Sequence, residues 1–357
     1  MGLFSDILKS DETLFKNPVA LEFSFQPKLI KYREEKQHYI ASCIKPLLQE
    51  RDGRNLIITG KPGVGKTVCL KHVLGELEEE YSEEIFCIYV NCWKKDSPFK
   101  MVSEICEQVG YKWVHNKRID ELIKAAATII NKKSAVFVFD EIDKLQDHLV
   151  IYNLLEEIYK KSLILITNDD GFLSKLDQRV KSRLMPNTLK FEPYSLIQTS
   201  GILKQRVEWA FYEEVFNEEI LELISKKTFE NEDIRLGLFL LKESAEMAEG
   251  FAKRKVELDH VNQSLEKINE FKTKDLNYLD KKKQYLLELV KKNNGKTINE
   301  IFKIYQDEGG SQTYRTFHRK VKDLESKKLL QLKEEFRGSF GRVTIVEYDT
   351  NKKINEF

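Results

Sequence analysis

Four residues at a fixed spacing carry the clearest chemistry in this chain. Gly60, Gly65, Lys66 and Thr67 follow the pattern G-x4-G-K-T, directly after the apolar run Leu56–Thr59. Glycines let backbone N–H groups curl around phosphate oxygens, and the N-terminus of a following helix favours negative charge. The lysine of this pattern reaches the β- and γ-phosphates, and the threonine hydroxyl ligates Mg²⁺. Other residues of the same turn are expected to touch the nucleotide: Pro62, Gly63, Val64 and Val68. The pattern therefore predicts a P-loop that binds ATP or ADP with Mg²⁺, a chance match being the alternative.

Two further apolar runs end in polar side chains. The run Ala135–Phe139 is followed by Asp140 and Glu141, and the run Leu163–Thr167 is followed by Asn168. Strand ends of this kind meet at the ligand-binding edge of an open α/β sheet. Asp140 is expected to hold Mg²⁺ through water, and Glu141 to polarise the attacking water. Asn168 is expected to orient that water, an ordinary turn asparagine being the alternative.

Two arginines are candidates for contacts with phosphate. Arg183 closes the segment Leu176–Arg183 and is a candidate arginine finger for the nucleotide site of a neighbouring molecule. A solvated basic helix is the alternative for this segment. Arg235 follows Asp233 at the start of a helical pattern, where it is a candidate to reach phosphate from a second domain. An ordinary salt bridge at the helix start is the alternative there.

The composition indicates several domains. A chain of 357 residues exceeds one ordinary core, so two or three domains are expected. The 59 Lys and Arg residues balance the 58 Asp and Glu residues, so the net charge argues neither for nor against nucleic acid. The five cysteines form no C-x-x-C pair and are expected to be reduced and mostly buried. Neither a long apolar run nor a signal pattern is present, which predicts a cytoplasmic protein without a membrane partner.

The order of elements predicts an α/β fold followed by helices. Between residues 53 and 193, strand-like runs alternate with helical patterns, which indicates a parallel sheet covered on both faces. The five runs are Leu56–Thr59, Ile85–Val90, Val136–Phe139, Leu163–Thr167 and Thr188–Phe191. Helical periodicity dominates residues 195–270, with Asp233 and Asp259 expected as N-caps. Residues 271–277 are expected to form a polar linker.

The last part of the chain predicts a winged helix. Helical patterns near residues 278–293, 297–308 and 311–328 precede two strand-like runs, Leu330–Glu335 and Arg342–Tyr348. Four residues of the third pattern are expected to face the core: Tyr314, Phe317, Val321 and Leu324. The opposite face offers amide, hydroxyl and cationic groups that suit base edges and phosphates: Gln312, Arg315, Thr316, Arg319 and Lys322. Arg337 and Arg342 flank the turn between the strands, where they suit the DNA backbone or minor groove. A winged helix that binds protein is the alternative.

Taken together, these motifs resemble those of AAA+ ATPases, and more narrowly those of the archaeal origin-recognition initiators, which are relatives of the eukaryotic origin recognition complex and its loading factor. The resemblance spans about residues 12–349. The motifs that carry it are Tyr32–Glu34, Gly60–Thr67 (Walker A), Phe139–Asp143 (Walker B), Thr167–Asn168 (sensor 1), Leu176–Arg183 with Phe191–Tyr194 (the arginine-finger segment) and Glu232–Arg235 (sensor 2). The chain departs from the family at Glu232, where the pattern has glycine. It also lacks the glycine of an extra DNA-contacting motif, which falls at Tyr111–Arg118.

The resemblance implies three domains: an AAA+ α/β nucleotide-binding domain at 1–194, a helical lid at 195–270 and a winged-helix α+β domain at 276–357. It implies that Pro27, Leu29, Ile30 and Arg33 lie by the adenine, and that Arg235 contacts the nucleotide from the lid.

The function that the resemblance implies is an ATP-dependent DNA replication initiator, which binds double-stranded origin DNA and hydrolyses ATP slowly. The partners that it implies besides DNA are other initiator copies and the replicative helicase. Two alternatives remain open on the sequence. One is a nucleotide-bound DNA scaffold or transcription regulator without turnover. The other is a P-loop signalling ATPase whose winged helix binds protein.

Overall fold

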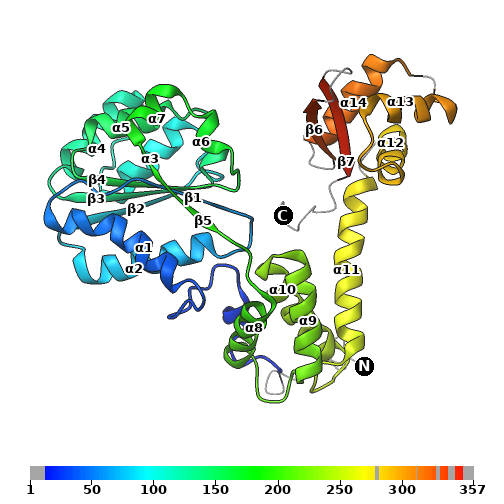
Figure 1. The fold of residues 1–357 in the computed structure, drawn as a ribbon. Coiled ribbons are helices and arrows are strands. Elements are labelled where there is room, and N and C mark those ends of the chain that lie inside the picture. The colour runs from blue at the N-terminus through cyan, green and yellow to red at the C-terminus, as the bar shows by residue number, and fades with distance from the viewer. Residues whose placement is uncertain (1–12, 278–280, 311, 327–329, 337–341, 349–357) are drawn as a thin grey trace. The chain divides into compact units, whose positions relative to one another are not determined.

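The computed structural model describes residues 13–277, 281–310, 312–326, 330–336 and 342–348 (Figure 1). The chain divides into two compact units, residues 8–242 and 243–357, and each is described by itself. Within the described residues, no helix is both long and apolar enough to cross a membrane.

A five-stranded parallel sheet forms the centre of the first unit. Its strands are β1 Leu56–Gly60, β2 Ile85–Asn91, β3 Ser134–Asp140, β4 Lys161–Ile166 and β5 Asn187–Phe191. They lie in the order β2-β3-β4-β1-β5, and every pair is parallel. The predicted α/β fold is confirmed, and each expected strand is present within two residues at each end.

Helices cover both faces of the sheet (Figure 1). The helices of one face are α1 Glu34–Ile44 and α2 Lys66–Tyr81. Those of the other face are α3 Pro98–Gln108, α4 Ile119–Ile130, α5 Leu149–Glu157 and α7 Gln178–Leu184. Successive residues of a strand point to opposite faces, so Ile164 packs with α1 and α2 while Leu163 and Leu165 pack in the core on the other side. This alternation explains why the central strands are apolar throughout. The remaining short helices of this region are η2 Lys45–Gln49, η3 Ile142–Lys144 and α6 Phe172–Lys175.

The chain after β5 is helical. Ser195 caps α8 Leu196–Ala210 in a capping box with Gln198, and Asn217 caps α9 Glu218–Asn231 through the Ile220 N–H. A third helix, α10 Ile234–Gly250, begins directly after Asp233, the residue predicted as its N-cap.

The segment before α1 packs on α8. The backbone of Phe15 pairs with Phe211, and the short helix η1 Pro18–Leu21 follows. Arg206 of α8 donates to the Ala20 carbonyl at 2.8 Å. Residues 13–21 are therefore held to the helical part of this unit.

Two expectations about the start and end of α11, the helix that follows α10, are wrong. In the second unit, α11 runs from Leu258 to Asn277, so Asp259 lies in its first turn and is not its N-cap. The expected linker at 271–277 is the end of α11 instead. These seven residues contain neither glycine nor proline, so nothing in them breaks a helix that is already formed.

The rest of the second unit is a winged helix, as expected. Its elements are α12 Lys281–Lys292, α13 Ile298–Asp307, α14 Tyr314–Ser326, β6 Leu330–Phe336 and β7 Arg342–Tyr348. Strands β6 and β7 pair antiparallel, and an isolated antiparallel bridge joins Thr297, just before α13, to Ile345 of β7. Phe317, Val321 and Leu324 of α14 are fully buried, as expected. Tyr314 is 40% exposed, and its ring contacts Phe302 edge-on and His318 of the same helix, because it lies in the first turn of α14 at the edge of the core.

Candidate functional site

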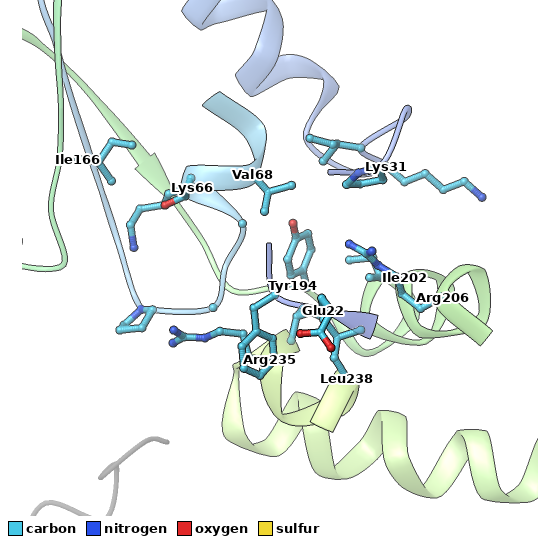
Figure 2. A pocket seen from close by; sticks show the side chains of 18 of the residues that line it. Glu22, Lys31, Lys66, Val68, Ile166, Tyr194, Ile202, Arg206, Arg235 and Leu238 are labelled. Carbon is cyan, nitrogen blue, oxygen red and sulfur yellow. The ribbon is translucent and has the colours of Figure 1, made fainter. Parts of the chain in front are cut away.

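A pocket of about 310 Å³ lies in the first unit, where the carboxyl ends of β1, β3 and β4 face α8 and the start of α10. Lys66 of α2 and Arg235 of α10 direct their cationic ends toward one end of this pocket (Figure 2). Its size falls within the usual range for small-molecule sites. Most of the predicted nucleotide-binding residues line it: Pro27, Leu29, Ile30, Pro62, Gly63, Gly65, Lys66, Thr67, Val68, Asp140, Glu141, Asn168 and Arg235.

The Lys66 ammonium is held above the P-loop. It donates to the carbonyls of Gly60 at 2.7 Å and Lys61 at 2.9 Å, and to Asn168 Oδ1 at 2.8 Å. Burial is the main cause that lowers the pKa of Lys66 to about 8, and the carboxylate of Asp140 opposes this shift. An anion at this place would restore the favourable environment of the charged ammonium.

Thr67 and Asp140 come together from α2 and β3. The Thr67 hydroxyl donates to Asp140 Oδ2 at 2.7 Å, and the Tyr89 hydroxyl donates to the same oxygen at 2.7 Å. Asp140 is 3% exposed. Among the described residues, no cluster of three or more His, Cys, Asp or Glu side chains could hold a metal by itself. A threonine and one carboxylate fit Mg²⁺, which keeps several waters and shares phosphate oxygens with its substrate.

Glu141 follows Asp140 in a left-handed backbone conformation, with φ +54°. Burial and then the neighbouring Asp140 and Asp143 raise the pKa of its carboxyl group. A raised pKa makes a carboxylate a better proton acceptor, which suits a group that polarises water. Thr167 beside Asn168 donates to Asp143 at 2.8 Å, which fixes the end of β4 next to β3.

Arg235 is oriented by its neighbour Asp233. The Asp233 carboxylate is 3% exposed, and it accepts from Arg235 Nε at 3.1 Å, from Nη2 at 2.9 Å and from the Arg235 backbone N–H at 3.0 Å. It also lies directly against Gly63: a Cβ at Gly63 would be 1.8 Å from Asp233 Oδ1. Beside it, Glu232 forms an ion pair with Lys61. The junction between α9 and α10 therefore packs directly against the P-loop turn.

Two predicted nucleotide-binding residues do not line the pocket. Val64 is 1% exposed and packs in the core between the sheet, α1 and α2. Arg33 is 6% exposed, and its guanidinium bonds the carbonyls of Val64 and Glu192 rather than facing the cavity. For Val64, the P-loop pattern could not show this, because it determines the course of the backbone and not the direction of each side chain. Arg33 lies outside that pattern, and only the family resemblance implied that it lies by the adenine.

Several lining residues are not among the predicted site residues, although two of them, Thr167 and Tyr194, belong to motifs that carry the family resemblance. These lining residues are Glu22, Phe23, Lys31, Ile166, Thr167, Tyr194, Ile202, Gln205, Arg206, Ile234 and Leu238. Ile202, Arg206 and Leu238 lie toward the end of the pocket away from Lys66 (Figure 2). Arg206 has one sequence signal, because it shares the buried face of α8 with Leu203 and Ala210. A cation on an apolar helical face indicates a structural or binding role.

Arg183 lies outside the pocket, on α7. Its guanidinium forms an ion pair with Glu156 of α5 at 2.6 Å, and its side chain is 57% exposed. Within one molecule it therefore does not join the predicted catalytic residues.

In the winged helix, four of the predicted DNA-facing residues lie on α14, namely Arg315, Thr316, Arg319 and Lys322, whereas Gln312 precedes this helix by two residues. Arg315, Arg319 and Lys322 are exposed, while Thr316 and Gln312 are partly buried. Arg337 and the side chain of Arg342 lie outside the described residues.

Comparisons with known proteins agree with this geometry. Residues 49–171 match the model described as "AAA domain", and residues 200–266 match the "Cdc6 AAA+ ATPase-type lid domain". The ORC1-type DNA replication protein of Pyrococcus abyssi is 30% identical, covering 95% of this chain and 88% of that protein. ORC1-type DNA replication protein 2 of Methanothermobacter thermautotrophicus is 28% identical, covering 96% and 93%.

Solved structures show the same fold. The Aeropyrum pernix ORC1 protein in complex with DNA matches with a TM-score of 0.71 at 25% identity, covering 96% of this chain and 95% of that one. The Aeropyrum pernix ORC2 protein, in ADPNP–ADP complexes, matches with a TM-score of 0.71 at 21% identity, covering 94% of each chain. On the strength of the sequence relatives and the two matched domain models, the chain belongs to the ORC1-type DNA replication proteins, a family of AAA+ ATPases.

Proposed function

We propose that this chain initiates DNA replication by binding double-stranded origin DNA, and that ATP binds in the pocket between the P-loop and the helices after β5. The observation that carries the nucleotide site is the convergence of Lys66, Asp140, Glu141 and Arg235 on one end of the pocket, beside a helix N-terminus. Positive groups and free backbone N–H groups favour a triphosphate at that end. The apolar side chains at the other end favour the base.

Each residue of the site has a separate role in ATP hydrolysis. Lys66 and Arg235 neutralise the phosphates, and Thr67 with Asp140 would hold Mg²⁺, whose role is to share the phosphate charge. Glu141, with its raised pKa, accepts hydrogen bonds from the attacking water, and Asn168 helps to orient it. Because Arg183 is not in the pocket, a finger role requires a second copy of the chain whose Arg183 has left Glu156. Turnover by one copy alone would then be slow.

The nucleotide site is tested by Lys66→Ala. Its replacement removes the cation that bonds Gly60, Lys61 and Asn168, so ATP and ADP affinity should be lost while the circular dichroism spectrum stays native. Normal affinity in this variant would contradict the P-loop assignment. Turnover measured with and without DNA separates an ATPase from a permanently nucleotide-bound scaffold.

The exposed cations of α14 support DNA binding by the winged helix. The Aeropyrum pernix ORC1 protein was solved with DNA, which supports the same role here. Arg315 and Arg319 project from the side opposite the buried Phe317 and Val321, as a helix that enters the major groove requires. We place this activity on the chromosome in the cytoplasm, with other initiator copies and the replicative helicase as further partners.

DNA binding is tested by fluorescence anisotropy on specific and scrambled duplexes across a salt series. Arg315→Ala and Arg319→Ala should cost about 1–3 kcal/mol on the preferred site and relax its specificity. Arg337→Ala and Arg342→Ala should weaken all duplexes and reduce the salt slope by about 1 each. Lys292→Ala, which removes an exposed charge at the end of α12, is the control. Wild-type binding by all four arginine variants would favour a protein-binding winged helix.

A further inference from the structure

Arg33 is a buried cation underneath the P-loop. Its guanidinium donates to the Val64 carbonyl from Nε at 3.3 Å and from Nη2 at 3.0 Å, and Nη2 also donates to the Glu192 carbonyl at 2.6 Å. The guanidinium carbon lies 3.8 Å from the centroid of the Tyr194 ring and 5.4 Å from that of Phe191. One side chain thus joins the phosphate-binding turn to the segment between β5 and α8.

The bond to Val64 orients the next N–H of the P-loop. The Val64 carbonyl and the Gly65 N–H belong to one peptide unit, and a trans peptide holds these two groups antiparallel. The chain has no cis peptide among its described residues. With the carbonyl fixed toward Arg33, the Gly65 N–H is directed away from Arg33, on the side where Gly65 lines the pocket. Donation to the carbonyl oxygen also polarises the peptide, which makes that N–H a stronger donor.

The charge of Arg33 has no ionic partner in the described part of the chain. Its three hydrogen bonds go to backbone carbonyls, and its planar faces contact aromatic rings. Carbonyl oxygens and ring faces satisfy a guanidinium but do not neutralise it. The positive potential of a buried cation is screened little by solvent, so it extends to the phosphate-binding side of the P-loop.

We propose that Arg33 is a positioning residue for phosphate: it holds the Val64–Gly65 peptide in its phosphate-binding orientation and adds positive potential below the P-loop. It does not touch the base. Arg33 therefore sets the affinity for the phosphate part of the nucleotide and leaves the affinity for the nucleoside part unchanged. The inference rests on the proposed nucleotide site.

Two variants separate geometry from charge. Arg33→Met keeps an unbranched apolar side chain as far as the position of Nε but removes the charge and every donor. Arg33→Lys keeps the charge but loses the planar guanidinium that donates to the carbonyls of both Val64 and Glu192. Affinities for ADP, inorganic diphosphate and adenosine are measured by calorimetry, with ligand-observed NMR for adenosine. Arg33→Met should weaken ADP and diphosphate by about tenfold to a hundredfold, the worth of a charged hydrogen bond. Arg33→Lys should lie between this variant and wild type, and adenosine should bind all three alike.

A matched core variant controls for loss of stability. Leu122→Ala removes buried atoms of α4 on the opposite face of the sheet, without a contact to the P-loop. It should lower the melting temperature and leave ADP affinity unchanged. Equal losses for ADP and adenosine in Arg33→Met would show a base contact and overturn the proposal, as would ADP affinity no weaker than in Leu122→Ala. Lys66→Ala in the same assay reports on the proposed site itself, so a failure of that site is seen separately.

Discussion

Replacing Gly63 by alanine should separate Asp233 from Arg235. The new Cβ would lie 1.8 Å from Asp233 Oδ1 and 2.3 Å from Cγ, so the carboxylate must move off the P-loop. Gly63 has φ +75°, and a non-glycine residue in that region costs about 1–2 kcal/mol by itself. Losing the bonds between Asp233 and Arg235 should add about 1–3 kcal/mol, discounted because the Arg235 side chain is 36% exposed. The free energy of unfolding should therefore fall by about 2–5 kcal/mol.

Gly110→Ala is the matched control. Gly110 has φ +84°, and a Cβ there would have no neighbour within 4 Å, so only the conformational cost of about 1–2 kcal/mol remains. Both variants are unfolded in urea and followed by circular dichroism. A third measurement uses Asp233→Ala, alone and with Gly63→Ala, because it removes the three atoms that the new Cβ would strike. The double variant should be more stable than the sum of the single changes predicts. The contact between Asp233 and the P-loop would be refuted by two results together. The two glycine variants would lose the same free energy of unfolding, and the losses of Gly63→Ala and Asp233→Ala would add up in the double variant.

Three further predictions concern the same region. ATP phosphates favour protonated Lys66, whose pKa is about 8 in the free protein, so ATP affinity should be nearly full below about pH 7, about half of that at pH 8, and about fivefold lower again at pH 9; Lys66→Arg should abolish this dependence, and a flat wild-type profile would contradict it. Glu141→Gln should bind ATP normally and reduce turnover to background in a phosphate-release assay, because it keeps the size but loses the proton-accepting carboxylate; persistent turnover would assign the water to another group. Glu232→Gly should raise the free energy of unfolding by about 0.5 kcal/mol, because relief of φ +53° outweighs a surface ion pair with Lys61; a loss above about 1 kcal/mol in thermal melts would show that the pair matters more.

The local parts of the site follow from the sequence. The P-loop, the acidic end of β3 and the asparagine after β4 depend on a strand followed by a turn of given residue types, and the strand ends meet because parallel strands share one edge. Periodicity likewise predicted Phe317, Val321 and Leu324 in the core, because residues three or four apart share one face of a helix, whereas Tyr314 of the same pattern is 40% exposed. The expected linker at 271–277 failed for a complementary reason. Its polar composition predicts a break, but helix formation depends on backbone propensity, and no residue there opposes a helix.

What the sequence by itself determined is therefore the family, the order of elements and the residues whose chemistry follows from a local pattern. Only the tertiary structure decided that Arg33 turns under the P-loop instead of toward the pocket. It also decided that Asp233 rests on Gly63, that Arg206 reaches the pocket from α8, and that Arg183 is held by Glu156. The physical reason is that these contacts join residues far apart in the chain. Which residues meet depends on how the sheet and the helices pack, and the spacing of residues within one segment carries no information about that packing.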